Sequence, residues 1–220
     1  MRRERMIKAV IFDMDGLMFN TEVMFKKQFR DALDVAHIQC PDSVIESMIG
    51  CSSRTIKRYE DQYPGITEVM EDCQQNRVDY FFDYFKKAGD ANMPGLENLV
   101  HYLEDIHMPF AIASSSYIED ILRFIDYAGF PIEPKAIVSG RDGFPSKPAP
   151  DIFLEAAKRL GMRPEDCLVL EDSKHGITAA YRAGMDSIFV PDQVKPDDEM
   201  KQYIKHTCKD LNEVIEFLKK

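Results

Sequence analysis

Two aspartates separated by one residue, Asp13 and Asp15, follow a short apolar segment near the start of the chain. That segment, residues 9–12, is apolar at every position, which is typical of a central strand in a parallel sheet covered on both faces. Ligands bind such sheets beyond the carboxyl ends of the strands, and Gly16 lets the chain turn sharply there. We therefore expect both carboxylates at the mouth of a ligand-binding crevice.

The same Asp-x-Asp-Gly spacing occurs in solvated turns and in calcium loops. A calcium loop requires further oxygen ligands and a closing glutamate. Met18 and Phe19 occupy positions where oxygen ligands should continue, and no glutamate closes the loop at the right spacing. The pattern therefore favours a strand-end site over a calcium loop.

Three serines follow a second apolar segment, residues 110–113. By itself, a serine run is most simply read as a helix cap. It can also present the Ser114 hydroxyl and the backbone amides of Ser115 and Ser116 to an anion at the start of the next helix. Ser114 and Ser115 are therefore candidate anion contacts.

A lysine and two adjacent carboxylates complete the set of candidates. Lys147 lies between prolines that fix the backbone on both sides, which suits either an exposed lysine or a positioned cation. Glu171 and Asp172 directly follow the apolar residues 167–170. Because adjacent carboxylates repel each other, either solvent or a bound cation must compensate for them, and hard oxygen ligands favour Mg²⁺.

Phosphoryl transfer needs this combination of groups. Attack of the Asp13 carboxylate on a phosphate dianion meets Coulomb repulsion, which Mg²⁺ and the Lys147 ammonium would offset. The product would be an acyl phosphate, whose carboxylate is a good leaving group in a second step. Asp15 would protonate the departing alkoxide and then deprotonate the incoming water.

The composition limits the partners of this 220-residue chain. Its 38 acidic and 28 basic residues give a formal net charge of -10, which argues against nucleic acid as a partner. No apolar stretch approaches the roughly 20 residues of a membrane span, and no long apolar signal core follows the first residues. Five cysteines without a Cys-x-x-Cys pair indicate neither a disulfide framework nor a zinc site. We expect a cytoplasmic monomer without a membrane partner.

Helical spacing of apolar residues dominates the chain between residues 20 and 90. Helices are expected over residues 21–36, 43–48, 53–62 and 67–87. Because no strand pattern interrupts them, we expect residues 20–90 to form a separate helical domain inserted after the first strand. Residues 1–19 and 91–220 would then form the other domain.

Strands and helices alternate in the rest of the chain. Strands are expected at 110–113, 136–138, 167–170 and 187–190, and helices at 96–106, 117–128, 150–160, 176–183 and 211–218. Asp210 is the expected cap of the last helix. The alternation predicts right-handed crossovers and a doubly wound parallel sheet, which is an α/β fold.

Four segments of the chain, taken in order, resemble the four motifs of the haloacid dehalogenase superfamily. They are DMDG at residues 13–16, the strand end at Ser114, KPAPDIF at residues 147–153 and LEDSKHGI at residues 170–177. The resemblance covers essentially the whole chain. It implies a Rossmann-like α/β core, with residues 20–90 as a helical cap.

The resemblance also implies roles for the matching residues. Asp13 would be the nucleophile and Asp15 the acid and base. Ser114 and Lys147 would hold the phosphoryl group.

A Mg²⁺ cofactor follows from the same resemblance. The ion would be bound by the Asp13 carboxylate, the Asp15 backbone carbonyl and Asp172. Glu171 would act on it through water.

Within the superfamily, the sequence is similar to the β-phosphoglucomutase-like group of phosphatases and mutases. Thr21 falls where the mutases have a threonine, but Phe25 stands where they have a histidine near the acid–base aspartate. Residues 49–53 align with the substrate loop of the cap but lack its lysine, and Arg54 is displaced by one position. These departures favour a phosphatase over a mutase.

The expected substrate is a small phosphorylated metabolite, a sugar or polyol phosphate. Candidate substrate-binding residues are Thr21, Ser52, Ser53, Arg54 and Ser115. His175 is either a further substrate contact or simply an exposed residue. The alternatives are a phosphosugar mutase and a non-catalytic protein that binds a phosphorylated metabolite, although the latter need not retain the nucleophile, acid, lysine and metal ligands together.

Overall fold

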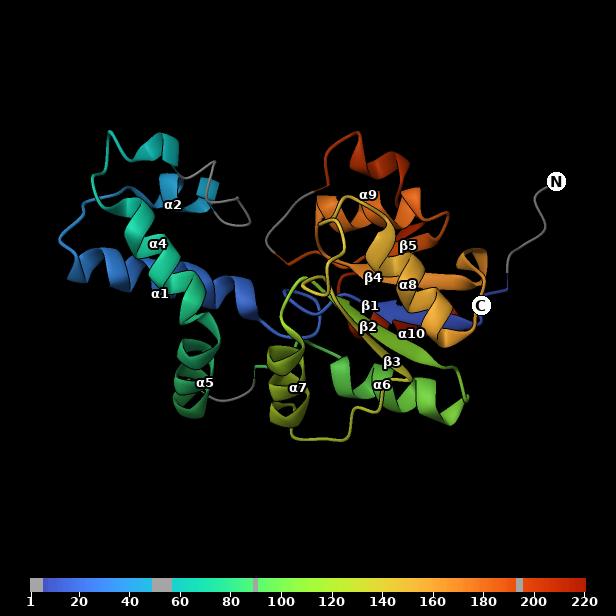
Figure 1. The fold of residues 1–220 in the computed structure, drawn as a ribbon. Helices are drawn as coiled ribbons and strands as arrows, with labels where there is room; N and C mark the ends of the chain where they lie inside the picture. The colour runs from blue at the N-terminus through green and yellow to red at the C-terminus, as the bar shows by residue number, and fades with distance from the viewer. Residues whose placement is uncertain (1–5, 49–56, 89–90, 193–195) are drawn as a thin grey trace. The chain divides into compact units, whose positions relative to one another are not determined.

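The computed structural model describes residues 6–48, 57–88, 91–192 and 196–220 (Figure 1). The chain divides into two compact units, one of Met1–Phe19 with Asn92–Lys220 and one of Asn20–Ala91. We call the first the core unit and the second the helical unit. No helix in the described ranges is both long enough and apolar enough to cross a membrane, and the four cysteines described are buried thiols.

The core unit is built on a six-stranded parallel sheet with the strand order β3-β2-β1-β4-β5-β6. The strands are β1 (Ala9–Phe12), β2 (Phe110–Ser114), β3 (Ala136–Ser139), β4 (Cys167–Glu171), β5 (Asp186–Phe189) and β6 (His206–Thr207). This order places β1 between β2 and β4, and every residue of β1 is fully buried. The predicted doubly wound parallel sheet is confirmed, with the continuous apolar segment as its central strand.

Helices cover both faces of this sheet. They are α6 (Leu96–Asp105), α7 (Ile118–Tyr127), α8 (Asp151–Leu160), α9 (Lys174–Arg182) and α10 (Leu211–Leu218), with 3₁₀ turns at Pro164–Asp166 and Met200–Gln202. Alternate strand residues point to opposite faces, and Ile11 packs in one apolar cluster with residues of α8 and α9. Figure 1 shows α6 on the opposite side of the sheet. As predicted, Asp210 caps α10, because its carboxylate accepts a hydrogen bond from the Glu213 N–H at 3.1 Å.

The helical unit has an apolar core of its own. Its elements are α1 (Thr21–Val35), α2 (Asp42–Met48), a 3₁₀ turn at Lys57–Tyr59, α4 (Ile66–Gln75) and α5 (Arg77–Ala88). Phe25 and Phe29 from α1 are buried in one cluster with Met70 from α4. Burial of one apolar face of each helix therefore stabilises this unit.

The expected helix over residues 67–87 is wrong, since the chain forms two helices that meet at Asn76. The Asn76 side-chain amide donates hydrogen bonds to the carbonyl oxygen of Asp72 at 3.1 Å and to its carboxylate at 3.0 Å. Short polar side chains that bond locally in this way compete with helix propagation. Asn76 is therefore the C-cap of α4 rather than an interior position.

The expected helix over residues 53–62 is also not supported where the structure describes it. Residues 53–56 lie outside the described ranges, and the chain beyond them forms only a 3₁₀ turn and irregular turns. The Glu60 carboxylate accepts hydrogen bonds from the N–H groups of Gly65 at 2.7 Å and Thr67 at 3.0 Å. This segment therefore folds back to satisfy the amino-terminal N–H groups of α4.

Candidate active site

The carboxyl end of β1 brings Asp13 to the edge of the sheet. Phe12 pairs with Leu170, and the Asp13 N–H donates to the Leu170 carbonyl at 3.0 Å. Asp13 is thus the neighbour of Glu171, the last residue of β4. The Asp13 side chain is almost completely buried. Gly16 then turns the chain with a φ of 77°, a backbone conformation that favours glycine.

Lys147 joins these two neighbouring carboxylates. Its ammonium contacts the Asp13 carboxylate and donates hydrogen bonds to Glu171 Oε1 at 2.7 Å and to the Ala113 carbonyl at 3.4 Å. The Lys147 Nζ atom also lies 4.7 Å from the centre of the Phe153 ring. Only 8% of the lysine side chain is exposed, so the cation is positioned and buried rather than solvated.

Carboxylate charges outnumber the Lys147 cation among the groups described at this strand end. Burial raises the pKa of Asp13 to about 7; the Lys147 ammonium opposes this rise, whereas the charges of Glu171 and Asp15 add to it. Burial by itself lowers the pKa of Lys147, but the charges of Asp13 and Glu171 raise it above its ordinary value. The lysine therefore stays an ammonium, and a further cation would favour the ionised form of Asp13.

Glu171 links Lys147 to the start of α9. Its Oε1 atom accepts the hydrogen bond from Lys147, and its Oε2 atom accepts from the N–H and the hydroxyl of Ser173, both at 2.9 Å. Ser173 is the N-cap of α9, where its hydroxyl oxygen accepts from the Gly176 N–H at 3.0 Å. A Cβ atom at Gly176 would lie 1.6 Å from Glu171 Oε1, so the close approach of this helix requires glycine.

Two serines at the carboxyl end of β2 bind Asp15: Ser114 is the last residue of the strand, and Ser116 follows it. The Ser116 hydroxyl donates to Asp15 Oδ2 at 2.9 Å, and the Ser114 hydroxyl donates to the same oxygen at 3.3 Å. The serine run predicts the Ser114 hydroxyl and two backbone amides as contacts, but it does not predict the Ser116 hydroxyl. That contact depends on a side-chain rotamer, which no residue spacing encodes.

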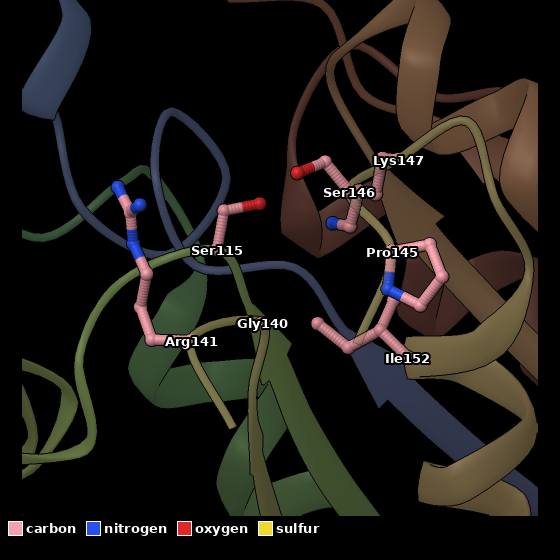
Figure 2. A pocket seen from close by; sticks show the side chains of 7 residues that line it. All are labelled: Ser115, Gly140, Arg141, Pro145, Ser146, Lys147 and Ile152. Carbon is pink, nitrogen blue, oxygen red and sulfur yellow. The ribbon is translucent and has the colours of Figure 1, made fainter. Parts of the chain in front are cut away.

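A small pocket of about 90 Å³ opens beside Lys147. Its lining residues are Ser115, Gly140, Arg141, Pro145, Ser146, Lys147 and Ile152. Figure 2 shows the hydroxyls of Ser115 and Ser146 pointing toward each other across this pocket. Small-molecule sites usually have volumes of about 300 Å³ or more. The pocket therefore fits a polar group of a ligand rather than a whole metabolite.

The strand-end carboxylates offer the oxygen atoms that Mg²⁺ prefers. Asp13 directly follows β1 and Asp172 directly follows β4. These two strands pair with each other, and both side chains are nearly buried. Among the described residues, no three His, Cys, Asp or Glu side chains are grouped to hold an ion, and Lys147 lies between Asp13 and Glu171. The donor types and the excess negative charge fit Mg²⁺, and a backbone carbonyl would have to complete its ligand set.

The remaining candidate substrate contacts are spread over both units. In the helical unit, Thr21 is the first residue of α1 and is buried, while Phe25 stacks on Phe29 with ring centroids 6.4 Å apart. Residues 52–54, which include the predicted serine and arginine contacts, lie outside the described ranges. His175 is exposed on α9 in the core unit.

Comparisons with known proteins agree with the motifs. Residues 10–190 match the family of haloacid dehalogenase-like hydrolases. A protein of Drosophila melanogaster named "Probable pseudouridine-5'-phosphatase" is 30% identical over 201 residues, which cover 86% of this chain and 83% of that protein. The fructose-1-phosphate phosphatase of Escherichia coli (strain K12) is 29% identical over 189 residues, covering 83% and 95%. The crystal structure of β-phosphoglucomutase from Clostridium difficile matches the fold with a TM-score of 0.73 at 22% identity, covering 97% and 96%.

Proposed function

The chain belongs to the haloacid dehalogenase-like hydrolase family, and on this premise we propose that it hydrolyses a small phosphorylated metabolite, a sugar or polyol phosphate. The names of two relatives support this substrate class, since one refers to pseudouridine 5'-phosphate and the other to fructose 1-phosphate. The observation that carries the proposal is the contact of Lys147 with both Asp13 and Glu171. This contact supplies a carboxylate nucleophile with a buried cation beside it.

In the first step, Asp13 is the nucleophile. Its carboxylate oxygen attacks phosphorus while the bond between phosphorus and the sugar oxygen breaks, which gives an acyl phosphate on Asp13. The Lys147 ammonium offsets negative charge on Asp13 and on the phosphoryl oxygens. Asp15 gives its proton to the departing sugar oxygen.

In the second step, water attacks the phosphorus of the acyl phosphate. Asp15, now a carboxylate, takes a proton from this water, and the Asp13 carboxylate leaves. Ser115 would contact the phosphoryl group during both steps. Ser114 would do so by turning its hydroxyl away from Asp15, to which it donates at 3.3 Å. The products are inorganic phosphate and an enzyme ready for the next substrate.

The Asp13 carboxylate, the Asp15 backbone carbonyl and Asp172 would hold Mg²⁺, and Glu171 would reach it through water. When bound, Mg²⁺ supplies positive charge that stabilises the phosphoryl oxygens. The excess of buried carboxylate charge around Lys147 supports this assignment.

The helical unit would act as the cap that recognises the rest of the substrate. Thr21, Ser52, Ser53 and Arg54 are its candidate contacts. The small volume of the pocket beside Lys147 supports this role, because the pocket holds only part of a sugar phosphate and the sugar needs contacts beyond it.

The proposal is tested by measuring phosphate release from sugar phosphates, polyol phosphates and nucleotides in the presence of Mg²⁺. We expect Asp13→Asn to lower the rate by at least about 10³-fold, because the amide is not a nucleophile. Asp126→Asn, at an exposed position on α7, is the matched control and should leave the rate unchanged. If Asp13→Asn released phosphate as fast as the wild-type protein, Asp13 would not be the nucleophile and the chain would not be an enzyme of this kind. If the wild-type protein released no phosphate from any of these substrates, a non-catalytic binding protein would be the better reading.

A further inference from the structure

The hydroxyl of Ser116 makes a contact with Asp15 that the serine run alone does not indicate. Its hydrogen bond to Asp15 Oδ2, at 2.9 Å, is shorter than the 3.3 Å bond from Ser114 to the same oxygen. Ser116 is 7% exposed and Ser114 is fully buried. Hydrogen bonds that a carboxylate accepts are stronger than those between neutral groups, particularly where water is excluded.

The Ser116 backbone is itself fixed by its surroundings. Its N–H donates to Ser114 Oγ at 3.0 Å, and its carbonyl accepts from the buried Ser139 hydroxyl at 2.8 Å. Ser139 ends β3, and its hydroxyl oxygen accepts in turn from the Arg141 N–H at 3.1 Å. The turn that presents Ser116 is therefore held by a strand that contributes no group to the reaction.

We propose that Ser116 is a positioning residue for Asp15, and that Ser139 holds Ser116 in place for this task. This inference rests on the proposed function, in which Asp15 transfers a proton to the sugar oxygen and then takes one from water. A proton donor must lie within hydrogen-bond reach of the atom that it serves, and a displacement of about 1 Å can cost about 100-fold in rate. Two hydroxyls on one oxygen restrict how the Asp15 carboxylate can rotate.

A positioning role and a purely structural role for Ser116 predict different effects on the reaction rate. Substrates with different leaving groups distinguish these two roles. An alkoxide from a sugar needs a proton as it departs, whereas 4-nitrophenolate does not. Loss of Asp15 positioning therefore slows the first step selectively for an alkyl phosphate, whereas the second step, in which Asp15 acts as the base, is common to both substrates. A general loss of structure would slow both kinds of substrate.

The test compares the first step alone, as release of fructose from fructose 1-phosphate and of 4-nitrophenolate from 4-nitrophenyl phosphate in a single turnover, for wild-type protein and Ser116→Ala, each also combined with Asp15→Ala. We expect Ser116→Ala to slow single-turnover release of fructose by about 10-fold, with a change below about 3-fold for release of 4-nitrophenolate. In the Asp15→Ala background, Ser116→Ala should have no further effect, because its contribution passes through Asp15.

Two further variants keep the test decisive. Ser187→Ala is the matched control, since Ser187 is fully buried in β5 and its hydroxyl bonds the Tyr203 carbonyl at 3.4 Å, apart from the Asp15 cluster; it should change neither rate. Ser139→Ala serves if Ser116→Ala does not fold, and it should show the same preference for slowing the alkyl phosphate.

Equal losses on both substrates, or an undiminished effect in the Asp15→Ala background, would overturn the positioning role while leaving phosphatase activity intact. Absence of phosphate release by the wild-type protein from either substrate and across the wider screen would instead overturn the proposed function, and this inference with it.

Discussion

Asp13 and Glu171 depend on the same buried cation, and this dependence makes Lys147 important for stability as well as for chemistry. Lys147→Met leaves two nearly buried carboxylates without their partner, which should lower the free energy of unfolding by about 3–5 kcal/mol. Urea unfolding in the presence of a metal chelator measures this difference.

Lys174→Met is the matched control for this experiment. Lys174 also contacts two carboxylates, Asp197 and Glu199, both at 2.7 Å, but its side chain is 42% exposed. Its loss should cost far less stability than the loss of Lys147, because solvent screens exposed ion pairs. Equal losses for the two variants would show that burial does not govern the energetics of the Lys147 cluster.

The residue types at the strand ends could be predicted from the sequence, but their side-chain partners could not. Asp13 follows an apolar run and Lys147 lies between prolines, so their positions are local features of the sequence. The contacts of Ser116 with Asp15 and of Ser173 with Glu171 depend on rotamers and on how separate loops meet. Such contacts become visible only once the strands are paired.

The first turn of α9 packs directly against the Glu171 carboxylate of the site, and Gly176 is the residue that permits this close approach. Alanine normally stabilises a helix relative to glycine by about 1 kcal/mol. Here the added Cβ atom would lie 1.6 Å from Glu171 Oε1, so the carboxylate must move away and disturb its bond to Lys147. We expect Gly176→Ala to destabilise the protein by about 1–3 kcal/mol and to slow phosphate release.

Thermal unfolding and phosphate release measure these effects, and His175→Ala is the control for stability. His175 precedes Gly176 on α9 and is exposed, so its replacement should change stability by less than about 0.5 kcal/mol. A Gly176→Ala protein as stable and active as the wild type would show that the carboxylate can shift without consequence.

In the helical unit, α1 and α5 are joined by a hydrogen bond that makes stability depend on pH. The Tyr80 hydroxyl donates to Asp31 Oδ2 at 2.6 Å, and this bond, with the nearby Lys27 ammonium, lowers the pKa of Asp31. A lowered folded-state pKa means that the contribution to stability is present above the ordinary aspartate pKa of about 3.9. It is lost as the pH falls through the lowered value.

Tyr80→Phe should therefore raise the pKa of Asp31 toward its ordinary value and flatten the acid side of the stability profile. NMR titration of the Asp31 carboxyl measures the pKa directly. Lys27→Met should also raise it, since the Lys27 hydrogen bond and charge lower the pKa of Asp31 as well. An unchanged Asp31 pKa in Tyr80→Phe would contradict this account.

The boundaries of the elements could be predicted where the pattern is strong and local. The apolar run of β1 and the Asp210 cap of α10 are examples. The break between α4 and α5 at Asn76 could not be predicted, because the apolar stripe continues across it. The break depends on a hydrogen bond from Asn76 to Asp72. Strand β6 could not be predicted either, since its two residues are exposed and carry no alternating pattern.

At the scale of the whole molecule, the choice between phosphatase and mutase depends on how long the phosphoaspartate is kept from water. Phe25 is buried in the core of the helical unit and has no group that could hydrogen-bond an acid–base aspartate. We expect β-glucose 1-phosphate, supplied with glucose 1,6-bisphosphate and Mg²⁺, to yield inorganic phosphate or no product. Rapid formation of glucose 6-phosphate without phosphate release would show that the chain is a mutase.

The topology of the core unit could be predicted because strands that alternate with helices allow few arrangements of a parallel sheet. The motifs could then be placed together at one edge, since the carboxyl ends of parallel strands share it. The role of the helical unit as a cap stays a prediction. Residues 52–54 lie outside the described ranges, and their contacts with a substrate depend on a ligand that the sequence does not name.

The most direct measurement of the central claim is mass spectrometry of Asp15→Ala after acid quench of its reaction with 4-nitrophenyl phosphate and Mg²⁺. 4-Nitrophenolate departs without a proton donor, so the first step proceeds, whereas the second step lacks the base that activates water. The account predicts one phosphoryl group on the peptide that contains Asp13, and none in the protein that also carries Asp13→Asn. Continued turnover without a phosphoryl group on Asp13, or a phosphoryl group on another residue, would contradict it.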